Sequence, residues 1–267
     1  MTAIYYHLFY LYPLSSWINK YLKHQSSSYA RKNSLYEKAC REIGEYTREP
    51  VETVKEKHKK GTGENQATAI FEHQNRITSE SVENFYKEYS YYLYELPLWN
   101  AERARPYYLW RVIKPYILQY SYKKILDYGG GAGDLCLELA SQGLDVAYYD
   151  ISRPLQEFVN WRFTRRTIHM LMYNDPEQII EPFDCVVSFD VFEHLKDLPG
   201  RLDIISPKIK KGGSLIFSGA FSGGSLHLEE NEIYNDFKAM DPLLTSRGFR
   251  FLKKFAQFYF YEKFSNP

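Results

Sequence analysis

The fold of this chain is decided by the stretch Lys124-Ile-Leu-Asp-Tyr-Gly-Gly-Gly-Ala-Gly-Asp-Leu-Cys-Leu137. It reads as an apolar strand that runs into a glycine cluster and then into a helix. A second strand over residues 144–149 follows and ends at Asp150. This order predicts the first βαβ unit of a nucleotide-binding, doubly wound sheet. Glycine has no Cβ and can adopt positive φ, so a ligand can lie directly on the backbone of such a turn. The carboxylate of Asp150 suits a ribose diol, because it can accept hydrogen bonds from both hydroxyls.

The spacing of the glycines indicates which nucleotide is bound. A dinucleotide fingerprint, G-x-G-x-x-G, counted from Gly129 and Gly131 would have its third glycine at position 134, where Asp134 stands. A carboxylate at the start of that helix would repel a pyrophosphate. The pattern is instead D-x-G-x-G-x-G, from Asp127 to Gly133, and its leading acid suits a cationic ligand.

These motifs resemble those of the class I S-adenosylmethionine-dependent methyltransferases, over residues 122–264. The glycine run matches the first motif of that family, and Asp150 matches its ribose-binding acid. Asn174-Asp175 matches the adenine-contacting segment, and residues 183–195 resemble the fourth-strand motif, especially in the branch of ubiquinone-biosynthesis methyltransferases. The resemblance implies S-adenosyl-L-methionine as cofactor and S-adenosyl-L-homocysteine as product. It also implies these cofactor contacts: Asp127, Tyr128, Gly129, Gly131, Gly133, Asp150, Ile151, Asn174, Asp175 and Asp190.

Composition limits the partners and the compartment. The net charge is +1, from 34 basic and 33 acidic residues, so bulk electrostatics favours neither a nucleic acid nor an anionic membrane. Cys40, Cys136 and Cys185 are far apart and odd in number, and no C-x-x-C pair or Cys/His cluster appears. We therefore expect a cytoplasmic protein with no disulfide, no structural zinc and no metal ligands.

The chain divides into two regions of different character. Residues 1–121 read as a helical, tyrosine-rich region, since 18 of the 25 tyrosines precede Lys123, and residues 122–267 read as a Rossmann-like methyltransferase domain. Tyrosine combines a flat apolar surface with a hydroxyl, which suits a substrate cover or a homodimer interface. The uncharged, aromatic segment 2–19 is too short and too interrupted to span a bilayer. We expect it to pack on the catalytic domain or a second subunit, with a membrane surface as the alternative.

Local patterns in the first region predict a helix over 34–46 and, over the polar residues 55–66, a solvated loop or a frayed end. The next helix is predicted to start near Thr78 or Ser79, with an apolar face that runs from Val82 to Leu93, and Asn100 could cap a further helix.

The second region predicts alternating strands and helices that end in an antiparallel hairpin, because the last two strands are too close for a helical crossover. The predicted strands are 124–128, 144–149, 168–173, 184–189, 213–218, 249–255 and 257–263. The predicted helices are 132–142, 153–165, 196–209 and 233–247. The fold class is therefore α/β, a doubly wound, mostly parallel seven-stranded sheet with an antiparallel C-terminal hairpin and a helical N-terminal region.

Methyl transfer needs alignment of the reactants and exclusion of water more than a fixed set of catalytic groups. A base helps only where the acceptor must lose a proton. The candidate catalytic residues are His227, whose imidazole has a suitable pKa, together with Asp190 and His194 after the fourth strand. The glycines at 223 and 224 are compatible with a mobile lid. The candidate substrate contacts are aromatic: Tyr89, Tyr92, Trp99, Phe192 and Phe221.

The sequence thus predicts an enzyme that transfers a methyl group from S-adenosylmethionine to a small-molecule acceptor, with the acceptor atom open. One alternative is a protein or nucleic-acid methyltransferase, which neutral charge and the absence of an Asn/Asp-Pro-Pro-aromatic motif after the fourth strand disfavour. A second is a protein that binds S-adenosylmethionine without reaction, or that uses it for intramolecular alkyl transfer. Asp127 and Asp150 argue against loss of the cofactor but do not separate these chemistries.

Overall fold

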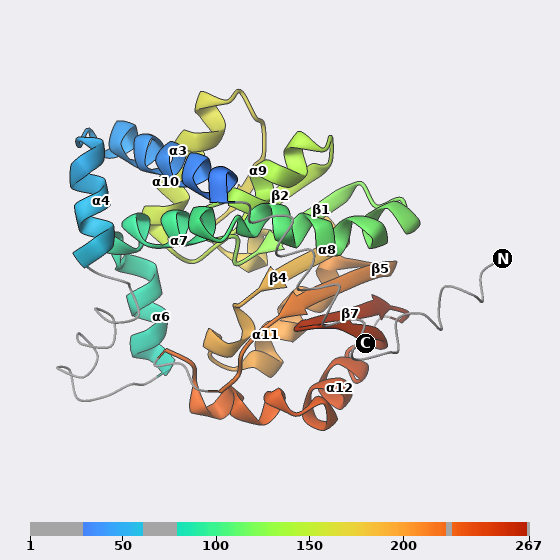
Figure 1. Cartoon of the computed structure of the whole chain (residues 1–267). Coiled ribbons are helices and arrows are strands. Elements are labelled where there is room, and N and C mark those ends of the chain that lie inside the picture. The colour runs from blue at the N-terminus through green and yellow to red at the C-terminus, as the bar shows by residue number, and fades with distance from the viewer. Residues whose placement is uncertain (1–28, 61–78, 223–225, 266–267) are drawn as a thin grey trace.

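The computed structural model describes residues 29–60, 79–222 and 226–265, as drawn in Figure 1. The aromatic segment 2–19, Thr78 and the glycines at 223 and 224 lie outside the described residues. Among the described residues, no helix combines the length and the apolar character that crossing a lipid bilayer requires.

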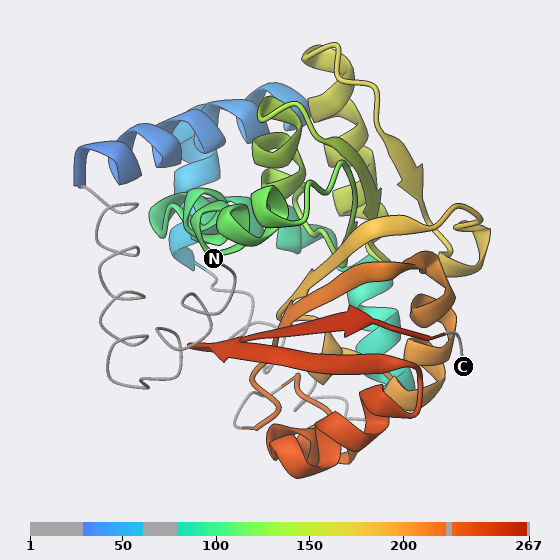
Figure 2. The same cartoon turned by 90° about the vertical axis from the view of Figure 1, so that its right-hand side faces the viewer.

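A seven-stranded sheet forms the centre of the molecule, with the strand order β3-β2-β1-β4-β5-β7-β6. Strands β1 to β5 are parallel, and β7 pairs antiparallel with both β5 and β6. The predicted fold class and the C-terminal hairpin are therefore confirmed, and Figure 2 shows the hairpin at the edge of the sheet. The strand bounds are β1 Lys124–Tyr128, β2 Asp145–Tyr149, β3 Leu171–Tyr173, β4 Phe183–Phe189, β5 Ile209–Ser218, β6 Phe249–Phe255 and β7 Phe258–Lys263.

Helices cover both faces of the sheet because successive strand residues point to opposite sides. Ile125 packs under α8 (Arg105–Gln119), α9 (Asp134–Ser141) and α10 (Arg153–Arg165). Its neighbour Leu126 faces α11 (Leu198–Ile205) and α12 (Phe237–Thr245) instead. The strand order reverses between β1 and β4, and such a reversal opens a crevice at the carboxyl ends of the strands.

The first region packs against α10 and over the loops at that crevice. Its elements are α3 (Tyr29–Thr47), α4 (Val51–Lys60), α6 (Ser79–Glu88), the 3-10 turn η1 (Ser90–Tyr94) and α7 (Leu96–Glu102). One cluster joins residues of α3, α4, η1 and α7 to Phe158 of α10. A second cluster joins Val82 of α6 to Leu226 and Leu228 after β5. Helix α8 packs on the sheet as part of its core, although the predicted boundary at residue 121 assigns it to the first region. The division into two regions at that residue stays a prediction.

Several local predictions for the first region were wrong. Residues 55–60 are the end of helix α4 and not a solvated loop, because Val54 is buried and the lysines of the last turn complement the helix dipole. Asn100 lies inside α7 and does not cap a helix. Helix α6 ends at Glu88, since Tyr89 adopts an extended conformation.

In the second region, the helix predicted over 196–209 becomes α11 followed by a 3-10 turn, η4 (Ser206–Lys208). Pro207 there lacks the N–H that an α-helix needs. The helix predicted over 233–247 is divided into the 3-10 turn η5 (Glu229–Asn235) and α12. Strand β5 begins at Ile209 and not at residue 213, because its glycines lie in an irregularity of the strand and not in a turn before it.

Candidate functional site

The glycine loop between β1 and α9 lies at the floor of the crevice. Gly131 has a φ of +52°, and a Cβ there would come within 2.5 Å of Leu96 Cδ2 on α7. The carbonyl oxygen of Gly131 accepts a 2.7 Å hydrogen bond from the buried hydroxyl of Tyr148, which holds the loop in place. Gly133 also has positive φ, but it packs against Val159 of α10 and does not line the pocket. The cofactor contact of Gly133 stays a prediction.

Two buried carboxylates flank this loop. Asp127, at the end of β1, is 3% exposed and accepts a hydrogen bond from Cys136 Sγ at 3.2 Å. Burial is the main cause that raises the pKa of Asp127 to about 7; the Cys136 hydrogen bond opposes the rise and the nearby Asp150 adds to it. Cys136 thus helps to orient the leading acid of the motif.

Asp150 is held by two backbone groups. Its Oδ2 accepts from Gly131 N at 2.7 Å, and its Oδ1 accepts from Ser152 N at 2.9 Å. Burial raises its pKa, and these backbone hydrogen bonds oppose the shift. A carboxylate has about four acceptor positions, so Asp150 keeps capacity for a ligand diol.

Asp190 lies across the crevice, directly after β4. It adopts a φ of +58°, and its N–H donates to Ser218 O on β5 at 2.9 Å. Its Oδ1 accepts from Ser218 Oγ at 2.8 Å, and its Oδ2 pairs with Arg105 Nη2 at 2.5 Å. Arg105 starts α8, so this ion pair joins the helical region to the sheet at the rim of the site.

Glu193, His194 and His227 form a second group on the same side. Glu193 is 1% exposed, and its Oε1 accepts from Ala220 N at 3.0 Å. Burial, with a contribution from Asp190, raises the pKa of Glu193 to about 7. The rings of His194 and His227 have centroids 4.9 Å apart. Glu193 and His194 lie in the 3-10 turn η3 (Phe192–His194).

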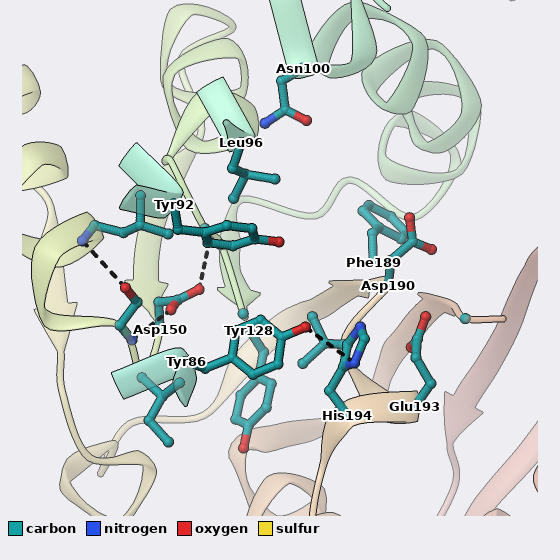
Figure 3. A pocket seen from close by; sticks show the side chains of 18 of the residues that line it. Tyr86, Tyr92, Leu96, Asn100, Tyr128, Asp150, Phe189, Asp190, Glu193 and His194 are labelled. Atoms are coloured by element: carbon teal, nitrogen blue, oxygen red, sulfur yellow. Dashed lines mark hydrogen bonds between the residues drawn. The ribbon is translucent and has the colours of Figure 1, made fainter. Parts of the chain in front are cut away.

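Aromatic side chains from the first region form the opposite wall. Tyr86 on α6 contacts His194, with its hydroxyl 3.3 Å from His194 Nδ1. Tyr92 and Trp99 also line the pocket, whereas Tyr89 stacks on Phe85 with ring centroids 4.3 Å apart and does not line it. In Figure 3, Asp150 lies on one side of the pocket, Asp190, Glu193 and His194 lie on the other, and Tyr86 and Tyr92 lie between them.

These groups surround one cavity of about 820 Å³, within the range of about 300–1,000 Å³ that is usual for small-molecule sites. It brings together most of the predicted site residues: Asp127, Tyr128, Gly129, Gly131, Asp150, Ile151, Asp190, His194, His227, Tyr92 and Trp99.

Other predicted contacts lie elsewhere. Phe192 is fully buried against Phe217, and Phe221 is buried in the same core, so neither reaches the cavity. Asn174 and Asp175 follow β3 outside the lining, where the Asp175 side chain accepts from Glu177 N at 2.9 Å and starts a 3-10 turn.

Sequence reasoning missed a set of polar residues in the lining, four from the single segment 95–105 around α7 and two from after β4. No recognised motif in the sequence marks them. They are Glu95, Asn100, Arg103, Arg105, Lys196 and Arg201.

Comparison with known proteins agrees with this site. A family model described as a methyltransferase domain matches residues 100–231. An uncharacterised methyltransferase from Anoxybacillus flavithermus (strain DSM 21510 / WK1) is 26% identical over 156 residues, which cover 50% of this chain and 72% of that protein.

Solved structures resemble part of the chain. Magnesium protoporphyrin IX methyltransferase (ChlM) from Synechocystis PCC 6803, solved with bound SAM, has a TM-score of 0.43 at 17% identity, over 60% of this chain and 81% of that one. TehB from Haemophilus influenzae has a TM-score of 0.43 at 18% identity, over 57% of this chain and 62% of that one. These likenesses are partial, and the assignment depends on the matched domain, the strand order and the motifs at the strand ends. Residues 100–231 thus match a methyltransferase domain, and this match, the strand order and the motifs at the strand ends support a class I methyltransferase with S-adenosylmethionine as its cofactor.

Proposed function

We propose that this protein transfers a methyl group from S-adenosylmethionine to a small-molecule acceptor bound under the aromatic wall of the first region. The observation that carries the proposal is the single cavity that extends from Asp127 and Asp150 to His194 and His227. One end has the glycine loop and buried acids that suit an adenosyl group and a cation. The other end has polar side chains beside aromatic rings, which suit an organic acceptor.

The cofactor end of the cavity fits the group that the family uses. Gly131 lines the cavity without a side chain, Asp150 has spare acceptor positions, and Asp127 supplies a buried carboxyl close to where a positive charge would lie. A bound cation would favour ionisation of Asp127, whose pKa near 7 reflects burial. When bound, S-adenosylmethionine supplies a methyl group that its sulfonium charge has already activated.

The acceptor end positions the second reactant. We place Tyr92 and Trp99 as the walls that contact the acceptor, and Asp190, His194 and His227 as the polar groups next to its reacting atom. Closing such a site with aromatic rings excludes water and restricts the orientation of the acceptor. Tyr86 links the wall to His194 and would hold the two sides together.

We also propose a cytoplasmic enzyme, since Cys40, Cys136 and Cys185 are all free thiols. Residues 1–121 would act as a cover for the pocket. The alternative role, a homodimer interface through the N-terminal helices, predicts a dimer in light scattering that Tyr92→Ala and Trp99→Ala disrupt.

Calorimetry provides the first test. The protein should bind S-adenosylmethionine and S-adenosylhomocysteine in the micromolar range and NAD(H) far more weakly. Tighter binding of NAD(H) would contradict the assignment.

The second test uses cofactor with a labelled methyl group and a metabolite extract, followed by mass spectrometry of the products. Label in a small metabolite supports the proposal. Label in protein or nucleic acid would mean a macromolecular substrate. Label that stays on the nucleoside product would mean alkyl transfer within the cofactor.

A further inference from the structure

Three potential metal ligands meet on the acceptor side of the cavity. Glu193, His194 and His227 each offer one ligand atom, and these atoms all lie within 4.8 Å of one another. Glu193 and His194 follow β4, whereas His227 lies in the loop after β5. Because β4 and β5 are parallel neighbours, their carboxyl ends bring the two segments to the same edge of the sheet.

The His194 ring is oriented as a ligand would be. Its Nδ1 lies 3.0 Å from the carbonyl oxygen of Leu226, and a carbonyl can only accept, so Nδ1 carries the proton. The lone pair of the neutral ring is therefore on Nε2. Metal-binding histidines commonly donate their other ring N–H to a backbone carbonyl in this way, which fixes both tautomer and orientation.

The backbone that carries Glu193 and His194 is held firmly. Asn231 is 1% exposed, and its Nδ2 donates to Leu195 O at 2.8 Å and Phe192 O at 3.2 Å. Leu228 N also donates to Glu193 O at 3.0 Å. These bonds tie the turn after β4 to the segment that follows His227, so the two sources of ligands move together.

The two carboxylate oxygens of Glu193 are not equally paired. Its Oε1 accepts from Ala220 N, but its Oε2 is buried and has no hydrogen-bond partner among the described residues. Burying an unpaired carboxylate oxygen is costly, and buried charges are ordinarily paired or bound to a metal. Figure 3 shows the Glu193 carboxylate beside the His194 ring, on the side of the pocket where Asp190 lies.

We propose that Glu193, His194 and His227 bind a divalent transition-metal ion of the Zn²⁺, Co²⁺ or Fe²⁺ class. Two imidazole nitrogens and one carboxylate oxygen suit these ions better than Mg²⁺ or Ca²⁺, which prefer oxygen ligands. Ligands at about 2.0–2.2 Å from a tetrahedral ion stand roughly 3.3 Å apart, so small side-chain rotations bring these atoms onto one ion.

Three protein ligands leave at least one coordination position, and all three residues line the cavity. An ion there would bind an oxygen of the acceptor and lower the pKa of a hydroxyl group. The ion would therefore activate the acceptor in place of His227, which the sequence predicts as a base. The acceptor class that follows is an alcohol, phenol or carboxylate, and this part of the inference rests on the proposed methyl transfer. The metal site itself does not.

The test uses the full-length, tag-free protein after treatment with a chelator. Calorimetry with Zn²⁺ should give one ion per chain, and Co²⁺ should give a visible absorption spectrum of a protein-bound ion. Glu193→Gln, His194→Ala and His227→Ala should each weaken binding about 100-fold or more. His169→Ala and Glu177→Gln remove the same residue types outside the cavity and should leave binding unchanged.

The metal site is overturned if the wild-type protein binds no stoichiometric ion, or if all three ligand variants bind like wild type. Glu193→Gln keeps the size of the side chain and an acceptor for Ala220 N, so it remains informative if the alanine variants unfold in circular dichroism. S-adenosylhomocysteine binding is measured separately on the metal-free wild-type protein. If the protein binds S-adenosylhomocysteine but not Zn²⁺, the metal site alone is overturned. If it binds Zn²⁺ but not S-adenosylhomocysteine, the proposed function alone is overturned.

Discussion

The Nη2 atom of Arg162 lies 3.0 Å from Oε2 of Glu42, although 120 residues separate them in the sequence. Arg162 lies on α10 and Glu42 on α3, and each side chain is only 7% exposed. The same guanidinium donates to Asp134 Oδ1 at 2.7 Å and to the carbonyl of Ala132 at 2.5 Å. Arg162 therefore connects the first region to the glycine loop.

Replacing Arg162 should destabilise the fold strongly. Arg162→Leu leaves the carboxylates of Glu42 and Asp134 buried with less compensation, and breaking a buried pair costs about 3–5 kcal/mol. Arg166 also pairs with Glu42 and would retain part of the stabilisation. Chemical denaturation measures the decrease in the free energy of unfolding. Arg165→Gln is the matched control, because Arg165 forms a half-exposed ion pair with Glu45 and should contribute about 0–1 kcal/mol. Equal losses in the two variants would contradict the role of the buried pair.

The stability of the protein should fall in acid partly through Glu42. Burial raises the pKa of Glu42, but Arg162 and Arg166 outweigh it, so the pKa is lowered overall. A carboxyl with a lowered folded-state pKa contributes stability above its unfolded pKa of about 4.3, and this is lost as the pH falls through the folded value. The free energy of unfolding, measured from pH 7 down to pH 3, should therefore depend less steeply on pH below about 4.3 in Glu42→Gln. An unchanged slope there would show that other carboxyls dominate acid unfolding.

Gly131 should be required for cofactor binding and not for folding. Gly131→Ala places a Cβ in the cavity and a non-glycine residue in the left-handed region, which costs roughly 1–2 kcal/mol. Gly143→Ala is the control, since its φ of +78° imposes similar strain with no atom within 4 Å of the new Cβ. We expect both variants to fold, with a somewhat larger destabilisation in Gly131→Ala because Leu96 Cδ2 must move away from the new Cβ, and loss of S-adenosylhomocysteine binding in Gly131→Ala alone. Normal binding by Gly131→Ala would make this glycine a structural turn.

Asp150 should contribute about 1–3 kcal/mol to cofactor affinity through charge-assisted hydrogen bonds. Asp150→Asn is preferable to alanine, because one oxygen remains to accept from the backbone N–H groups that Asp150 now binds. The dissociation constant for S-adenosylhomocysteine should rise about tenfold or more by calorimetry. Asp145→Asn, at the exposed start of the same strand, should leave it unchanged. If Asp150→Asn binds like wild type, the ribose is held by another residue.

The aromatic wall should affect the acceptor and not the cofactor. Tyr92→Ala and Trp99→Ala remove side chains that line the cavity, so the KM for the acceptor should rise several-fold while S-adenosylhomocysteine affinity is retained. Tyr89→Ala is the control from the same segment, because Tyr89 itself does not line the cavity and stacks on the lining residue Phe85 from behind. A change only in oligomeric state, measured by light scattering, would mean that this region is an interface.

The sequence by itself determined the fold class and identified most of the residues that line one end of the cavity. The strand, glycine run and two acids of residues 124–150 are contiguous, and their local pattern specifies a βαβ unit because each element follows from short-range sterics and hydrophobic periodicity. Helix α10 was predicted with its observed bounds for the same reason.

Only the tertiary structure decided which distant side chains meet. The turn after β4 and the loop after β5 come together because parallel pairing sets the register of their carboxyl ends, and no local pattern encodes that register. This pairing places His227 beside Glu193 and His194, where the sequence showed no metal-ligand spacing. The packing of the turn after β4 also decides which of its side chains face the core. Phe192 is buried in the core, whereas its neighbour Glu193 lines the cavity.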